Sequence, residues 1–321
     1  MSSDAPLPVE PVALMRSRQY RVLLVLAVIV GLFVSAVAWG FLELVHKIQI
    51  WVYEDLPGDL GYHTEPTWWP LPWLALAGLL TALAIAYLPG RGGHVPSNGL
   101  KTGGTPTQPI ELPGVLLAAL ATLGLGLVLG PEAPLIALGI GLGVFAMRRL
   151  KSDAPDQAVG LMGAAGSFAA ISAIFGSPVI GAIIIVEAAG IGGAMLPVVL
   201  LPGLLAAGVG SLVFVGLGDW SGFSTSAWAL KPFPLPAYGG PSWGDFAWSI
   251  ALAVAAAVAT FGILEIARWT KRVVDQRLVL LTVVAGLVVG GLAIAYGQAA
   301  DRKSTRLNSS HSELSRMPSS A

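Results

Sequence analysis

Long runs of apolar residues with few charges are the feature that most constrains what this chain can fold into. The first run, 22–41, has about 20 residues, enough for a helix to cross a bilayer core of roughly 30 Å. Hydrophobic residues make up 55% of the chain and charged residues only 11%, whereas a soluble domain usually carries about 25% charged residues. Because so few charges cannot cover a surface in water, the sequence predicts an all-α polytopic integral membrane protein.

Nine apolar segments are predicted to be helices: 22–41, 71–88, 112–129, 135–147, 159–175, 179–186, 196–217, 246–266 and 278–296. At about 1.5 Å per residue, segments 135–147 and 179–186 are too short to cross the core alone. We therefore expect broken or re-entrant helices, which persist at membrane depth only when they are buried in protein or line a cavity.

The charges of the connecting segments predict the orientation. Basic residues gather in the N-terminal arm, in 89–111 and in 267–277, and the positive-inside rule places these segments in the cytoplasm. The N-terminal arm, 1–19, is polar, and no small-residue cleavage site follows the first apolar run. It is therefore predicted to be a cytoplasmic arm of a cell-membrane protein rather than a cleavable signal.

Composition also argues against other classes of protein. The formal net charge is 0, which gives no indication of a nucleic-acid partner. The chain has no cysteine, which excludes disulfides, thiolate metal sites and cysteine nucleophiles. The histidines are scattered in flanks or loops without a metal-ligand pattern or a matching nucleophile: His46, His63, His94 and His311. We predict neither an enzyme nor a cofactor.

The most informative segment is Gly130-Pro131-Glu132-Ala133-Pro134. No other charge occurs between Glu111 and Arg148, and an acidic residue at a membrane helix centre costs about 2.5 to 3.5 kcal/mol. Because proline belongs in the first helical turn, Glu132 is predicted to lie at or just before a helix N-terminus. The exposed amides and the positive end of the helix dipole stabilise negative charge there, and they would equally attract a permeating anion.

Two interpretations of Glu132 compete. In the first, it only stabilises the start of a buried helix. In the second, it is a tethered anion that competes with a mobile anion for one site. Serine or asparagine would cap a helix equally well without the cost of a buried charge, which favours the second interpretation.

Two other segments are weaker candidates. The loop Gly92-Gly93-His94-Val95-Pro96 is by itself a common turn pattern. The segment 178–187 is a proline-opened apolar helix that ends in Glu187. That carboxylate either ends the apolar run at the water boundary, which is the more common case, or lies on a buried pathway.

Together these three segments resemble motifs of the CLC family of chloride channels and chloride/proton antiporters. Family members carry a Gly-Ser-Gly-Ile-Pro loop, a Gly-Lys/Arg-Glu-Gly-Pro loop and a Pro-x-x-Gly helix that ends in an acidic residue. The order is the same here, and the resemblance covers about residues 16–296. It implies a homodimer with a pore in each subunit, inverted repeats whose broken helices point their N-termini at the anion, and Glu132 as the gating glutamate. It places eight residues along the anion pathway: Gly92, Gly93, His94, Pro96, Gly130, Pro131, Ala133 and Pro134.

Departures from the family pattern bear on function. Gly93 stands where the family has a coordinating serine, and Ala188 stands where the antiporters have a proton-relaying glutamate. The second departure favours a channel that passes chloride or a similar small inorganic anion passively. The alternative is a proton-coupled chloride antiporter, with Glu187 as a possible proton path. A more distant alternative is an unrelated inverted-repeat transporter for an organic solute or sodium.

The resemblance also divides the chain. Residues 20–217 match the first repeat, and 218–300 match an extracellular-side loop and the first helices of the second repeat. The family's second anion-site loop and late tyrosine have no counterpart before Ala300, so we expect an incomplete architecture that does not conduct by itself. From Asp301 the chain turns serine-rich and charged, and 301–321 is predicted to be a non-native polar tail.

Overall fold

The computed structural model describes residues 11–63, 65–95, 106–127, 129–190, 192–221 and 239–314, and within them it contains helices, turns and loops but no strand. Short helical turns, η3 (Pro109–Glu111), η4 (Gly193–Met195) and η6 (Asp275–Arg277), precede α5, α9 and α11. The α-helices are α1 (Pro11–Arg16), α2 (Arg18–Ile50), α3 (Leu56–Asp59), α4 (Pro70–Tyr87), α5 (Leu112–Gly124), α6 (Glu132–Leu150), α7 (Asp156–Phe175), α8 (Pro178–Ala189), α9 (Leu196–Ser221), α10 (Trp243–Val274) and α11 (Leu278–Leu314).

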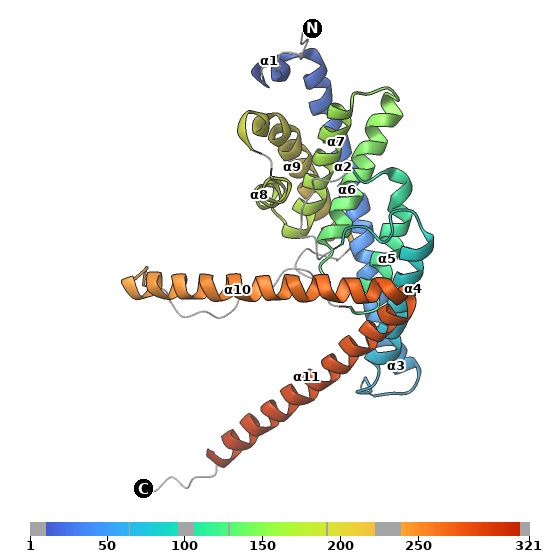
Figure 1. Ribbon diagram of the computed structural model, residues 1–321, viewed down its shortest axis with the longest axis vertical. Coiled ribbons are helices and arrows are strands. Elements are labelled where there is room, and N and C mark those ends of the chain that lie inside the picture. Colours follow the sequence, from blue (N-terminus) through green and yellow to red (C-terminus); the bar gives the residue numbers. More distant parts are fainter. Residues whose placement is uncertain are drawn as a thin grey trace.

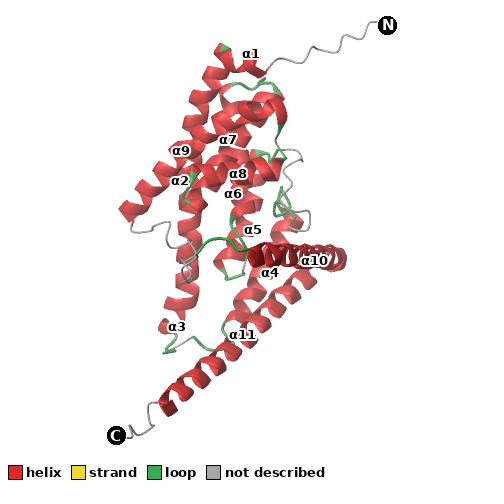
Figure 2. Cartoon of the chain, turned by 90° about the vertical axis from the view of Figure 1, so that its left-hand side faces the viewer, coloured by secondary structure: helices red, strands yellow, loops and turns green. Residues whose placement is uncertain are grey.

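Within the described residues, six helical segments are long and apolar enough to cross a membrane, which confirms the predicted all-α membrane fold. Near the N-terminus, α2 continues into α3 through a π-helix, η1 (Trp51–Asp55), and the three form one rod. The rod therefore runs without a break over 42 residues, Arg18–Asp59, well beyond the predicted 22–41. Figure 2 shows α2 running the length of the bundle from α1 to α3.

Each of the nine predicted apolar segments forms a helix over most of its length, but several bounds differ, and α5 ends at Gly124 instead of residue 129. The prediction that 135–147 is too short to cross a membrane is wrong, because α6 has 19 residues. The helix extends past its apolar residues because Glu132 in its first turn and Arg148 and Arg149 in its last turn complement the helix dipole. By contrast, α8 has only 12 residues and is short, as predicted.

The predicted boundary at Asp301 lies inside a helix, because α11 continues through Leu314. The non-native origin of the polar segment 301–321 stays a prediction.

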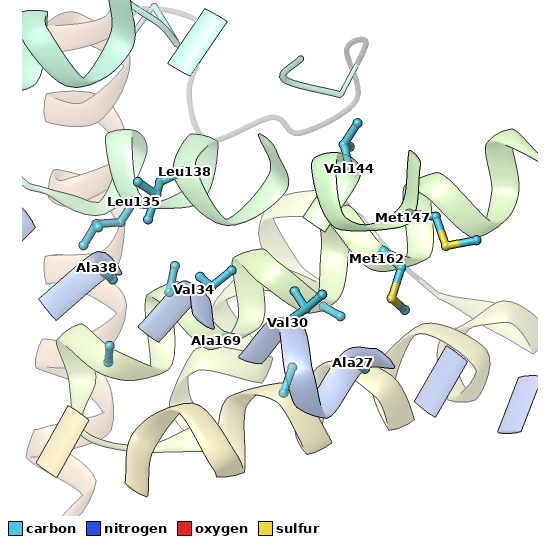
Figure 3. Close-up of a cluster of buried hydrophobic side chains, with 14 of the residues drawn as sticks. Ala27, Val30, Val34, Ala38, Leu135, Leu138, Val144, Met147, Met162 and Ala169 are labelled. Atoms are coloured by element: carbon cyan, nitrogen blue, oxygen red, sulfur yellow. The ribbon is translucent and has the colours of Figure 1, made fainter. Parts of the chain in front are cut away.

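The main hydrophobic core lies where α2, α6, α7 and α9 meet. One face of α2 supplies residues at helical spacing, and Figure 3 shows them beside side chains of α6 and α7. The labelled members of this cluster are Ala27, Val30, Val34 and Ala38 of α2, Leu135, Leu138, Val144 and Met147 of α6, and Met162 and Ala169 of α7.

Glycines allow the helices of this core to approach closely. A Cβ atom at Gly139 of α6 would overlap the backbone of Gly166 in α7, and one at Gly31 of α2 would overlap Ala206 in α9. Small residues at such crossings let membrane helices pack backbone to backbone. The position of α6, and therefore of Glu132 at its start, is fixed by this packing.

The last two helices differ from the core. Figure 1 shows α10 lying across the long axis of the molecule and α11 diverging from it, with their junction near α4. Helix α11 packs on α4, where a Cβ atom at Gly78 would lie 2.5 Å from the carbonyl oxygen of Thr282. Helix α10, which is described in full, contains no buried residue.

Candidate functional site

The site begins where α5 ends. Leu127 N–H donates to the carbonyl of Thr122 (2.9 Å), and Gly126 N–H donates to that of Leu123 (3.2 Å). With Gly126 at a φ of 93°, these two bonds form the Schellman motif that terminates many helices. The left-handed conformation favours glycine because a side chain would be strained there. This motif ends α5 at Gly124 rather than at the predicted Leu129, and the chain then turns towards Glu132.

Sequence reasoning missed two residues of the long α2–α3 rod that contact this turn. Gln49 Nε2 donates to the carbonyl of Leu123 (2.8 Å), and the hydroxyl of Tyr53 donates to the carbonyl of Leu125 (2.8 Å). The two residues lie on either side of the junction between α2 and η1, and both side chains reach the same turn. Two hydrogen-bonding side chains close together in the sequence, beyond an apolar run, were the available signal.

Glu132 is the first residue of α6, so its predicted position at a helix N-terminus is confirmed. The preceding residue, Pro131, supplies no side-chain cap, and Leu135 N–H donates to the carbonyl of Pro131 (3.0 Å). Pro134 has no amide hydrogen. The helix geometry therefore leaves the amides of Glu132 and Ala133 as the donors with no intrahelical partner.

The carboxylate of Glu132 folds back over Gly130. A Cβ atom at Gly130 would overlap Oε2 of Glu132 and would lie 2.7 Å from its Cδ. Glu132 is half-buried, whereas Gly130 is exposed. The absence of a side chain at Gly130 thus leaves room for the carboxylate beside the helix start, at the edge of the protein interior rather than in open solvent.

The family model described as "Voltage gated chloride channel" matches residues 90–316, most of the chain. The chain belongs to this family. It is similar to a solved structure of a slow cyanobacterial Cl⁻/H⁺ antiporter, with a TM-score of 0.63 and 19% sequence identity over 85% of this chain and 63% of that one. At that identity the likeness shows a shared fold.

Curated relatives of this CLC chain include two named putative ion-transport protein YfeO. The protein from Escherichia fergusonii is 30% identical over 169 residues, and the protein from Salmonella paratyphi A is 31% identical over 169 residues. Each match covers 53% of this chain and 40% of the relative. The chain therefore spans less than half the length of the curated relatives that it matches.

The first CLC-like loop forms a tight turn at the end of α4. Gly92 and Gly93 have φ values of 75° and 90°, and Gly93 N–H donates to the carbonyl of Gly90 (2.8 Å). Both glycines pack on neighbouring helices: a Cβ atom at Gly92 would lie 2.7 Å from Ile85 Cγ1, and one at Gly93 would lie 3.0 Å from Val115 Cγ1. His94 is exposed, and Pro96 lies outside the described residues.

This loop and Glu132 lie at different levels of the bundle. Gly90 contacts Glu111 at the start of α5, and the next residue, Leu112, packs against Gly141 in the middle of α6. Gly141 is about 13 Å along the helix axis from Glu132, at about 1.5 Å per residue. The described contacts thus do not join the loop to Glu132, and its predicted place on the anion pathway stays a prediction.

Glu187 is exposed near the end of α8. Its carbonyl accepts from the amide of Gly190 (3.2 Å), where a left-handed glycine ends the helix. The N-terminal end of α8 differs from that of α6, because the side chain of Ser177 caps it by accepting from the amide of Ile180 (3.3 Å). The predicted proton path through Glu187 stays a prediction.

Proposed function

We propose that the protein to which this chain belongs passes chloride or a similar small inorganic anion across a membrane, gated by Glu132. The observation that carries this proposal is the position of Glu132. It is a carboxylate at the start of α6, beside amides with no intrahelical partner, in a helix that has no side-chain cap. Membership of the voltage-gated chloride channel family supports the same function.

The proposed mechanism follows from electrostatics. The positive end of the α6 dipole favours one negative charge near the amides of Glu132 and Ala133. While the Glu132 carboxylate is charged and folded over Gly130, it occupies this position. When it is protonated or swings away, a mobile anion can take its place. Gating is then a competition between a tethered and a free anion for the same donors.

Passive conduction and proton-coupled exchange remain two candidate functions. The sequence favours a channel, because Ala188 carries no acid where the antiporters have a proton-relaying glutamate. The solved structure that shares this fold is of a Cl⁻/H⁺ antiporter, so exchange is the second candidate, for which Glu187 is the available acid. Proton uptake driven by a chloride gradient in liposomes would decide for the antiporter, and Glu187→Gln should then abolish proton movement while anion flux continues.

The decisive experiment is anion efflux from liposomes that contain the full-length protein. Glu132→Gln removes the charge and keeps the shape, so we expect faster flux that no longer depends on pH. Glu265→Gln is a matched control, because Glu265 is an exposed glutamate of α10, a helix with no buried residue. The absence of flux from both the parent protein and Glu132→Gln would refute anion transport.

We also propose that two copies associate in the cell membrane with their N-termini in the cytoplasm. Helix α8 presents apolar side chains that are exposed in the single chain, among them Val179, Ile180 and Ile183 at 61%, 45% and 63%. A second copy would cover such a face. Single-molecule photobleaching of labelled protein in liposomes should show two steps per spot, and a single step would contradict a dimer.

A further inference from the structure

The turn that carries Glu132 is attached to the α2–α3 rod at the end of α5. The last carbonyl groups of a helix lack the usual partners within it. Side chains of the rod bond two carbonyls at the end of α5, and one of them, that of Leu123, also accepts from Gly126 N–H. Gln49 donates to Leu123 and Tyr53 donates to Leu125. The two side chains reach across 74 and 72 residues of sequence, so these are tertiary contacts between the rod and the turn.

The aromatic ring of Tyr53 also fits against Gly126. A Cβ atom at Gly126 would overlap the Tyr53 hydroxyl and would lie 2.9 Å from its Cε2. The glycine that the Schellman motif requires for its left-handed conformation therefore also makes space for the ring. Gly124, two residues earlier at the end of α5, is in similar contact with Ile48, whose Cγ2 would lie 3.0 Å from a Cβ atom there.

The local structure of the rod places these side chains. The π-helix begins at Trp51, between Gln49 and Tyr53. A π-turn rotates the residues that follow it relative to an α-helix, and such turns are frequent at functional sites. The carbonyl of Val52 within η1 accepts from Trp69 Nε1 (2.9 Å), which holds the π-turn against the segment that leads into α4.

We propose that Tyr53 and Gln49 are positioning residues that hold the turn between α5 and α6, and thereby set where the Glu132 carboxylate lies. This inference rests on the proposed function only for its effect on transport. Glu132 follows Gly126 by six residues, and its helix is fixed at the other side by α7. Releasing the Tyr53 bond therefore allows the turn to move while the packed part of α6 stays in place.

A matched control exists within the chain. The hydroxyl of Tyr20 donates to the carbonyl of Val198 (2.9 Å), and Tyr20 is 1% exposed. Like Tyr53, it is a tyrosine of the rod that bonds a backbone carbonyl of another helix. It lies at the opposite end of α2 and does not contact the α5–α6 turn. Either Tyr→Phe change should lower the stability of the protein in general. Only Tyr53→Phe should change the position of the α5–α6 turn.

The first test measures the position of the turn without any transport. The 321-residue chain has no native cysteine, so Ala133→Cys provides a single thiol beside Glu132, at a half-buried position. We expect Tyr53→Phe to raise the maleimide labelling rate about fivefold, as expected for an opening equilibrium that loses one hydrogen bond. Tyr20→Phe should leave the rate unchanged.

A second variant keeps the test decisive if Tyr53→Phe does not fold. Gln49→Met preserves the length of the side chain, removes the donor to Leu123, and should raise the labelling rate in the same direction. Equal labelling rates in the parent, Tyr53→Phe and Gln49→Met would overturn the proposal. A rise of the same size in Tyr20→Phe would also overturn it, because the effect would then be general.

The second test links the turn to gating in the full-length protein. Tyr53→Phe should shift the pH midpoint of anion flux when Glu132 is present, and should have no further effect on flux in Glu132→Gln. An equal effect in both backgrounds would contradict action through Glu132. If no variant supports flux, the proposed function fails, and the labelling result alone still decides whether Tyr53 positions the turn.

Discussion

Helices α10 and α11 are consecutive and both strongly apolar, yet only α11 packs closely on an earlier helix, α4. Helix α11 places Thr282, Gly286 and Gly290 four residues apart, and both glycines are buried against α4. In α10, Gly262 has no atom within 4 Å of a Cβ position, and no residue is buried. Hydropathy therefore predicts that a segment forms a helix, whereas the spacing of small residues predicts which face meets a neighbour.

The largest expected effect comes from filling the α4–α11 crossing. A Cβ atom at Gly286 would overlap the carbonyl oxygen of Leu74, and a backbone cannot move aside cheaply. Gly286→Leu should therefore destabilise the packing of α11 on α4 by about 3 kcal/mol. The packing of α11 on α4 is measured by disulfide formation between Leu71→Cys and Gly290→Cys, whose positions are in contact. Gly286→Leu should reduce the yield of this disulfide.

Two controls sharpen this comparison. Gly291→Leu lies on the same helix and Gly262→Leu on α10, and neither Cβ position has a neighbour within 4 Å. Both variants should form the 71–290 disulfide as readily as the parent. If Gly262→Leu reduced the disulfide as much as Gly286→Leu, contact geometry would not be the cause.

A smaller effect is expected from shortening one valine in each region. Val34 of α2 is 0% exposed and Val258 of α10 is 68% exposed. Val34→Ala should cost about 1 to 2 kcal/mol of stability through lost packing, and Val258→Ala should change stability by less than about 0.5 kcal/mol. Thermal unfolding in detergent compares the two, and equal losses would contradict the difference between packed and open regions.

At the candidate site, an added methyl group meets a movable side chain instead of a backbone. Gly130→Ala should displace the Glu132 carboxylate at a stability cost of less than about 1 kcal/mol. If the charged carboxylate blocks the anion, flux should rise towards that of Glu132→Gln. Gly130→Ala added to Glu132→Gln provides the control, and should not raise flux further. A Gly130→Ala protein that keeps parental flux would argue against the folded-back carboxylate as the block.

The smallest effect is expected outside the spans, at the exposed Glu65. Partial desolvation raises the pKa of its carboxyl above the ordinary value. The charged form is therefore disfavoured in the folded state, and stability should fall slightly as pH rises from the ordinary pKa through the raised one. Glu65→Gln should remove this decrease and match the parent below that window. Unfolding temperatures of the parent and Glu65→Gln, measured from about pH 3.5 to about pH 7, test whether stability falls with rising pH. If the parent were more stable than Glu65→Gln at neutral pH, the predicted direction would be wrong.

Much of the fold was predictable because the signals are local. Long apolar runs predicted nine of the eleven α-helices in the described residues, all except the short α1 and α3. Pro134 with an isolated charge predicted that Glu132 begins a helix. Helix ends were less predictable. The chain has 40 glycines, and nothing local distinguishes Gly126, which ends α5, from glycines inside helices. The length of α6 was underestimated because charged residues at its ends were treated as boundaries.

The attachment of the turn to the α2–α3 rod was not predictable from local pattern. The hydrogen bonds of Gln49 and Tyr53 depend on how α2 packs beside α5 and on the π-turn at Trp51. These are properties of the folded molecule, and a spacing of four residues is common in any helix. The motif around Glu132 can be recognised in the sequence, whereas the contacts of Gln49 and Tyr53 with the turn before it are found only in the structure.

The unbroken rod of α2, η1 and α3 has a length that can be compared with the thickness of a membrane. Arg21 and Trp51 are about 45 Å apart along it at about 1.5 Å per residue, close to the roughly 40 to 45 Å of a bilayer with its headgroups. Trp51 stacks edge-on with Trp73, which contacts Trp69, and such aromatic groups settle at the membrane surface. Guanidinium groups at one headgroup layer and indole rings at the other would hold the rod nearly upright. The last turns of the rod then stand in water beyond the far leaflet.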